Sequence, residues 1–381
     1  MGDARPVSVT KLPDYMNADA PLLSSAPLLL APAEGLVVRK AVTISRRSRF
    51  TTWLLKTFLR PWLARLIRGS DEKIARIQLQ MSRMRCPKTY GQPLEYTVVG
   101  ALPGHVVGDL RDTTKPVILW LHGGAFILPA SPMAHLEMAC WFAAKLDAHV
   151  FLPDYRLAPR NRFPAALDDC ERAYRMLLDL GFPASRIAIG GDSAGGNLTL
   201  GVLQRIRKHG WPMPACALPV SPATELGRIH APDSRPRRMK QDPILPIAAL
   251  QRVDEMYAGD HDASDPELSP LYADCRGFPP IFVLASDNEV LLDDSVLFAR
   301  RAKAHGVDVR CEIWPMLPHA FPLFGSLYPE VRLARQDMLT YLQAQLGLPA
   351  TARAERAVAA MPARASDDSK PHARQRRTPS V

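Results

Sequence analysis

One serine stands among four glycines in the stretch IAIGGDSAGGNLTL, which runs from Ile187 to Leu200. The pattern Gly-x-Ser-x-Gly around Ser193 falls between a predicted strand and a predicted helix, a setting that lifts a serine hydroxyl clear at a sharp turn. A hydroxyl held in this way can attack a carbonyl carbon. The pattern also fits a glycine-rich turn or a phosphate loop, so it needs support from other residues.

A second glycine-rich stretch, LWLHGGAF, follows an apolar run that reads as a strand. Its residues Gly123, Gly124 and Ala125 allow the loop to fold with its amides facing inward. Together with the amide of Ala194, at the start of the predicted helix, they would hold the negative oxygen of a tetrahedral intermediate. The alternative interpretation is a plain β-turn.

A base and an acid are available further along the chain. Of the ten histidines, His319 is the best placed, because it follows a predicted strand in a loop before the last helix. The stretch ASDNEVLLDDS supplies carboxylates that could orient an imidazole, namely Asp287, Glu289, Asp293 and Asp294. Loop position alone favours Asp287 or Glu289 over the two aspartates of the following helix.

Length and composition limit the class of protein. The chain has 381 residues, 47% of them hydrophobic, which is enough to bury a large core. No apolar run approaches the roughly 20 residues that cross a bilayer, and the N-terminus lacks the features of a secretory signal. The six cysteines are far apart and form no CxxC pair. We therefore expect a cytoplasmic protein with reduced cysteines and no metal site.

The net charge of +10 suggests nucleic acid or anionic lipid as a partner, but its distribution argues against nucleic acid. Nine Lys and Arg residues and no acid lie in 36–69, and the tail 351–381 carries seven basic residues against three acids. The basic character therefore belongs to the two ends and not to the central domain.

Alternating strands and helices between these ends predict a mostly parallel sheet with helices on both faces. The expected strands lie within 94–100, 116–124, 149–156, 186–191, 279–286 and 309–315. The expected domains are a disordered extension (1–36), a helical cap (37–90), a catalytic domain (91–349) with a cap insertion (222–262), and a disordered basic tail (350–381).

The stretch RFTTWLLKTFLRPWLARLIRG, residues 49–69, reads as a basic amphipathic helix that Pro61 kinks or divides. Its expected apolar side consists of Phe50, Trp53, Leu54, Phe58, Trp62 and Leu66. This side would pack on the protein's own core or lid. Two alternatives stay open: residues 46–68 contact a membrane surface, or they join two copies in a homodimer.

These motifs together resemble the α/β-hydrolases, specifically the hormone-sensitive-lipase-like family of bacterial esterases. The resemblance runs from about Pro116 to Phe321 and includes HGGAF, DYRLAPRNRFPAALDD, GDSAGGNL, DPELSPLYAD, EVLLDD and HAF. Ala125 and Ala320 stand where the family usually has glycine. EVLLDD matches the family's acid motif with Glu289 in place of the acid, so the resemblance selects Glu289, with Asp287 and Asp293 as the alternatives.

The resemblance implies an α/β-hydrolase fold with a helical N-terminal cap and no cofactor. It also implies a serine carboxylic ester hydrolase that acts on short-to-medium acyl esters or lactones. Ser193 would form the acyl-enzyme, with His319 as its base and Glu289 as the acid. The lid residues Trp53, Leu54, Phe58 and Trp62 would line an acyl pocket. An amidase or deacetylase with the same triad, and a non-catalytic ligand receptor on this scaffold, are the competing interpretations.

Overall fold

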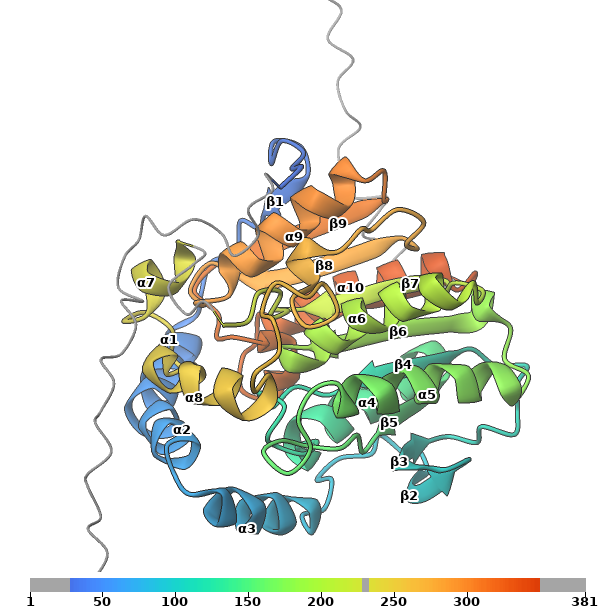
Figure 1. Cartoon of the computed structure of the whole chain (residues 1–381), viewed down its shortest axis with the longest axis horizontal. Coiled ribbons are helices and arrows are strands. Elements are labelled where there is room, and N and C mark those ends of the chain that lie inside the picture. The colour runs from blue at the N-terminus through green and yellow to red at the C-terminus, as the bar shows by residue number, and fades with distance from the viewer. Residues whose placement is uncertain (1–27, 228–232, 350–381) are drawn as a thin grey trace, which may run out of the picture. The chain divides into compact units, whose positions relative to one another are not determined.

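The computed structural model describes residues 28–227 and 233–349 (Figure 1). The chain divides into two units, Met1–Leu348 and Pro349–Val381, and all that follows concerns the first. The expected tail 350–381 and residues 1–27 of the expected N-terminal extension lie outside the described residues.

A single sheet of nine strands runs through the described part of the first unit. In space its strands follow the order β1-β9-β8-β7-β6-β4-β5-β3-β2. Only the pairs β2–β3 and β3–β5 are antiparallel, so the prediction of a mostly parallel sheet is confirmed. The strands are β1 (Val37–Arg39), β2 (Leu94–Val99), β3 (Leu102–Val107), β4 (Val117–Leu121), β5 (His149–Pro153), β6 (Ile187–Asp192), β7 (Cys216–Val220), β8 (Ile281–Ser286) and β9 (Val309–Trp314).

Helices cover both faces of this sheet. The α-helices are α1 (Arg46–Leu54), α2 (Arg60–Ile67), α3 (Asp71–Ser82), α4 (Glu137–Leu146), α5 (Ala165–Asp179), α6 (Ala194–His209), α7 (Ser234–Arg238), α8 (Ile247–Tyr257), α9 (Leu292–Ala304) and α10 (Val331–Gln345). In Figure 1, α5, α6 and α9 lie in front of the sheet, with α4 and α10 behind it.

The central strands are buried on both sides, because each face of the sheet has its own apolar core. Along β4, Leu119 and Leu121 pack with residues of α5, α6 and α9. Ile118 and Trp120 point the opposite way, into the core that α4 and α10 complete. This alternation follows from the two-residue period of a strand and explains why β4 reads as a continuous apolar run.

The cap is formed by segments from two distant parts of the sequence. In Figure 1 the blue helix α2 lies beside the yellow helix α8, which belongs to the insertion after β7. Arg60 of α2 donates to the carbonyl of Met239, and Arg252 of α8 forms an ion pair of 3.0 Å with Asp71. No helix in the described ranges is long and apolar enough to cross a bilayer.

The cap helix is divided next to Pro61, where the sequence predicts a kink or a division. A π-helical turn, Leu55–Leu59, separates α1 from α2 directly before Pro61. A π turn holds an extra residue, so it rotates everything that follows relative to a period of 3.6. The expected apolar side is therefore divided: Leu66 is buried, whereas Phe50 and Phe58 are exposed.

The N-terminal region contains two further differences from the expectation. Residues 37–39 form β1, which pairs with β9 in parallel, where a purely helical cap is predicted. The last residues of the expected disordered extension are also packed, since Ala31 exchanges backbone and side-chain hydrogen bonds with Arg300. A strand of three residues carries almost no periodic signal, and its partner lies more than 270 positions away.

Candidate active site

Ser193 occupies the sharp turn between β6 and α6. Its backbone has φ 56° and ψ −118°, a strained conformation for a residue with a side chain. A Cβ atom on Gly191 would lie 2.4 Å from the carbonyl oxygen of Gly195, and one on Gly195 only 1.8 Å from that of Leu121. Both glycines of the Gly-x-Ser-x-Gly pattern are therefore required by close backbone packing around the serine.

The glycine-rich loop after β4 lies next to this serine. Gly124 (φ 123°) and Ala125 (φ 56°) both adopt left-handed backbone angles, which turn the loop back toward the amino-terminal end of α6. The amides of Gly124, Ala125 and Ala194 donate no hydrogen bond to another described residue. Since Ala194 is the first residue of α6, its free amide also carries the positive end of the helix dipole.

Gly123, the first of the four expected oxyanion donors, lies against Asp192. A Cβ on Gly123 would lie 2.1 Å from a carboxylate oxygen of Asp192, so the two groups are in direct contact. Burial would raise the pKa of Asp192, but His135 and the amide of Gly123 hold it below its usual value. Asp192 therefore packs directly against Gly123, and a side chain at residue 123 would collide with its carboxylate.

A buried aromatic network lies beneath the loop. The hydroxyl of Tyr155 donates to the carbonyl oxygen of His122 over 2.6 Å, and the two rings stack with their centres 4.2 Å apart. Burial and the nearby His135 lower the pKa of His122 to about 3, so its imidazole is neutral. Nε2 of His135 lies 3.2 Å from Asp192. These contacts fix the start of the loop that carries Gly124 and Ala125.

The structure brings one of the three candidate carboxylates to His319. Nδ1 of His319 lies 2.6 Å from Oε2 of Glu289, and both side chains are buried. Asp287 instead accepts from the amide of Met316, and Asp293 accepts from that of Ser234. The longer side chain of Glu289 therefore reaches the imidazole, whereas the side chains of Asp287 and Asp293 bind backbone amides elsewhere.

The other oxygen of Glu289 is held by groups that the sequence did not single out. Oε1 accepts from the hydroxyl of Ser221 at 3.0 Å and from the amide of Ser286 at 2.8 Å. The Ser221 oxygen in turn accepts from the amide of Ala320, over 3.1 Å. Ser221 follows the last residue of β7, and that position at the carboxyl end of a parallel strand is the one signal that could have identified it.

Asp242, a second residue missed in the sequence, ties the cap insertion to the loop of the acid. Its carboxylate accepts from the amides of Ile244 and Leu245 in the insertion and from that of Val290, the residue after Glu289. Asp242 lies in an irregular stretch, where no periodicity or motif marks it. Its contacts fix the cap relative to the acid.

His319 presents its second nitrogen to a pocket. Nε2 is buried and has no hydrogen-bond partner among the described residues. Burial disfavours the charged imidazole, but the hydrogen bond to Glu289 and the charge of that carboxylate raise the pKa of His319 above its usual value. Ser193 and His319 line the same pocket. The unpaired nitrogen can therefore accept a proton from a group bound there.

The cap supplies one wall of this pocket, although with different residues from those expected. Leu59, Trp62 and Leu63 line it, as the amphipathic pattern leads one to expect for Trp62. Trp53 and Phe58 do not line it and are exposed on the outer side of the cap. The π turn before α2 is the physical reason, because it separates the face of α1 from the face of α2.

Comparison with known proteins places this geometry in a family. Residues 118–323, more than half of the chain, match the family described as alpha/beta hydrolase fold. An acetyl-hydrolase of Streptomyces hygroscopicus is 35% identical over 67% of this chain and 84% of its own length. The esterase LipU of Mycobacterium tuberculosis is 33% identical over 62% of this chain and 80% of its own.

A solved structure agrees with these relatives. The crystal structure of a hormone-sensitive lipase from a metagenome library superposes with a TM-score of 0.69 at 32% identity, covering 80% of this chain and all of that one. The elbow at Ser193, the loop at Gly124 and the Glu289–His319 pair lie at the expected ends of the strands of this fold. The chain belongs to the α/β-hydrolase fold family, among its hormone-sensitive-lipase-like esterases.

Proposed function

We propose that this protein hydrolyses carboxylic esters through an acyl-enzyme on Ser193. The observation that carries the proposal is the buried Glu289–His319 pair, whose unpaired Nε2 opens into the pocket that Ser193 lines. A hydroxyl, an imidazole and a carboxylate in this order are the parts that acyl transfer needs.

In the first half of the reaction, the hydroxyl of Ser193 attacks the ester carbonyl and passes its proton to Nε2 of His319. Glu289 keeps the proton on Nδ1 and stabilises the imidazolium that forms. The amides of Gly124, Ala125 and Ala194 receive the negative oxygen, and each such donor contributes about 3 kcal/mol in comparable sites. His319 then gives its proton to the departing alcohol oxygen.

In the second half, a water molecule loses a proton to His319 and attacks the acyl carbon. Collapse of this intermediate returns the proton to Ser193 and releases the acid. Neither half requires a redox step or an external group. The residues named above, the ester and one water molecule account for every bond that forms or breaks.

A serine-directed fluorophosphonate probe and 4-nitrophenyl acetate test the proposal together. The protein should take up one equivalent of probe and hydrolyse the ester, and Ser193→Ala should lose both properties. Ser295→Ala, which removes a buried hydroxyl of α9 away from the pocket, should retain both. Hydrolysis that survives in Ser193→Ala would assign the nucleophile to another residue.

An amidase or deacetylase would use the same three residues, so substrates must separate the two activities. We expect 4-nitrophenyl acetate to be cleaved orders of magnitude faster than 4-nitroacetanilide, because the anilide is the poorer leaving group. An anilide rate equal to or above the ester rate would reverse the assignment. Absence of cleavage with specific binding of both compounds would favour the non-catalytic receptor.

The same proposal includes a location: a cytoplasmic enzyme that contacts anionic membranes through residues 46–68. Phe50, Trp53 and Phe58 are 59%, 54% and 64% exposed, and their rings contact one another. The arginines of α1 and Lys56, in the same segment, are also exposed, and no acid occurs between residues 36 and 69. Aromatic rings beside basic residues suit the interface of an anionic bilayer, whereas two copies of such a surface repel each other.

Sedimentation with vesicles tests this location. The protein should pellet with phosphatidylcholine vesicles that contain phosphatidylglycerol and not with phosphatidylcholine alone. Replacing Phe50, Trp53 and Phe58 together by serine should abolish binding, while Val98→Ser with Leu180→Ser, exposed elsewhere, should not. If the triple variant instead dissociates a dimer in light scattering, the surface belongs to self-association and the membrane proposal fails.

A further inference from the structure

Two pockets meet at Ser193. The larger one spans about 1040 Å³ and the smaller one about 520 Å³, and both volumes include space that is open to solvent. Four residues belong to the walls of both, namely Ala125, Ser193, Leu245 and Leu250. An ester bound at the serine has two arms, an acyl chain and an alcohol, so each pocket is available for one of them.

The position of His319 decides which arm enters which pocket. The imidazole must give its proton to the departing alcohol oxygen, so that oxygen and its substituent lie on the histidine side of the serine. His319 lines only the larger pocket, together with Leu323 and Phe324, which follow it in the chain. The larger pocket therefore takes the alcohol, and the smaller one takes the acyl chain.

The larger pocket has an apolar wall contributed by the cap. Trp62, Leu63 and Ile67 of α2 and Met81 of α3 line it, together with the loop residues Ile127 and Leu128. Contact between such a wall and a long or bulky hydrocarbon is favourable, whereas a hydrophilic alcohol would find few polar partners there.

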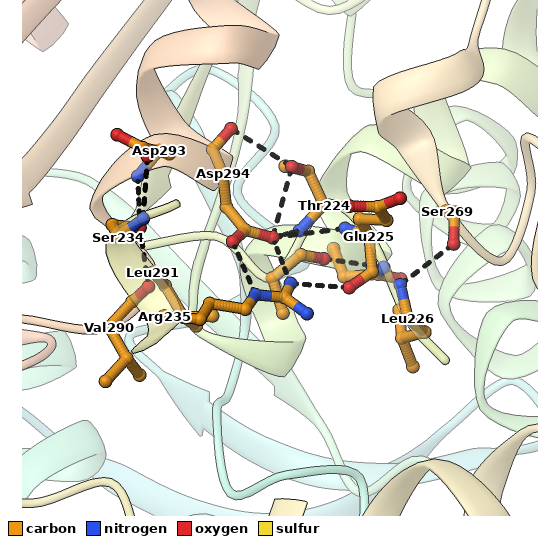
Figure 2. Close-up of polar contacts among 12 residues, drawn as sticks. Thr224, Glu225, Leu226, Ser234, Arg235, Ser269, Val290, Leu291, Asp293 and Asp294 are labelled. Carbon is orange, nitrogen blue, oxygen red and sulfur yellow. Dashed lines mark hydrogen bonds and ion pairs between the residues drawn. The ribbon is translucent and has the colours of Figure 1, made fainter. Parts of the chain in front are cut away.

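Buried charged groups that are held in place form part of the wall of the smaller pocket. Figure 2 shows the guanidinium of Arg235 bound to the carboxylate of Asp294, at 2.7 and 3.1 Å, and to the carbonyl oxygen of Glu225. Asp294 also accepts from the amides of Thr224 and Glu225 at 2.9 and 3.1 Å. Arg235 and Glu225 line the pocket directly, beside Asp254.

This charged wall and the smaller volume of the pocket limit the acyl chain. A long hydrocarbon would have to press against buried charged groups, which is unfavourable, or displace them, which would break a buried ion pair. The wall joins the cap helix α7 to α9 and to the segment after β7, so it cannot retreat without separating three parts of the fold.

Resting on the ester hydrolysis proposed above, we infer that this protein prefers esters of short acyl groups with large, apolar alcohols. In this substrate class the acid part is no longer than the wall at Arg235 allows, and the alcohol fills the space beneath α2. The preference depends on which side of the ester bond carries the bulk, and not on total hydrophobicity.

An isomeric pair of esters tests the inference. Octyl acetate and methyl nonanoate have the same atoms and differ only in the side of the ester that carries the chain. We expect a kcat/KM for octyl acetate at least about tenfold higher, measured by titration of the released acid. Equal rates, or a faster methyl nonanoate, would overturn the inference while ester hydrolysis itself stands. Cleavage of neither isomer nor of 4-nitrophenyl acetate would count against the proposed function.

A matched pair of truncations assigns each pocket. Val253 of α8 lines only the smaller pocket, and Leu63 lines only the larger one. Val253→Ala should raise the hexanoate-to-acetate ratio of 4-nitrophenyl esters and leave the ratio of octyl to ethyl acetate unchanged. Leu63→Ala should lower the octyl-to-ethyl ratio and leave acyl-length dependence unchanged. The opposite assignment of the two effects would show that the pockets are exchanged.

Discussion

Glu289 binds His319 through one carboxylate oxygen and Ser221 through the other. Oε2 lies 2.6 Å from Nδ1 of the imidazole, and Oε1 lies 3.0 Å from the hydroxyl of Ser221. The carboxylate is thus fixed on both sides. Its role in activity, in pH dependence and in the positioning of the base can each be measured separately.

Glu289→Gln should lower kcat by about 10³-fold or more with little change in KM, because the amide neither stabilises the imidazolium nor fixes the tautomer as a carboxylate does. Asp293→Asn is the matched control, since Asp293 accepts from the amide of Ser234 and does not contact His319. Steady-state kinetics with 4-nitrophenyl acetate distinguishes them. A larger loss in Asp293→Asn would transfer the role of the acid to that residue.

The acid limb of kcat/KM should report the pKa of His319 in the free enzyme. Glu289 raises this pKa, so the limb should lie above the value of about 6.5 that is usual for histidine. Because the charged imidazole cannot accept a proton, activity falls below this pKa. In Glu289→Gln the residual activity should have its limb shifted to lower pH; an unchanged limb would mean that another group titrates.

Ser221→Ala should lower kcat about tenfold, because about 1.4 kcal/mol is within the range of a buried hydrogen bond to a charged group. The loss should fall on kcat and shift the acid limb, since the hydroxyl acts through Glu289 and the loop at Ala320. Ser295→Ala should change neither. A Ser221→Ala enzyme with normal kcat and a normal pH profile would remove Ser221 from the positioning of the acid.

Asp254 should make the fold less stable as the pH rises. Burial raises its pKa to about 7, although Arg235 acts in the opposite direction. The folded state therefore holds a proton that the unfolded chain has released between about pH 4 and 7, so the free energy of unfolding falls with pH across that window. Asp254→Asn should raise Tm by about 1–3 °C at pH 8 and have little effect at pH 4, in thermal melts. Equal effects at both values would exclude this titration.

The sequence was most informative where a local pattern determines the backbone. Gly191 and Gly195 have to be glycine because neighbouring backbone atoms occupy the place of a Cβ, and that requirement appears as a motif around Ser193. The apolar runs of β4 and β8 likewise predict strands that are buried on both faces. The fold and its mostly parallel sheet could be predicted from such signals together with the family resemblance.

Features that depend on distant partners could not be predicted in this way. Loop position alone left Asp287 and Glu289 as equal candidates for the partner of His319, because the choice depends on side-chain length and on Ser221 at a distant strand end. Only the family resemblance selected Glu289. The π turn before α2 changed which aromatic residues face the pocket, because one extra residue in a turn alters the helical phase.

The short strand β1 has a consequence for any attempt to shorten the protein. It lies along the outer edge of β9, the amide of Lys40 continues the pairing to Ile313, and Lys40 binds Glu312 and Asp337. The chain leaves β9 directly into the loop that carries His319. Removing residues 28–45 would expose the backbone of β9 to pairing with other molecules, which promotes aggregation. The amino-terminal segment thus protects the strand that leads to His319, the proposed catalytic base.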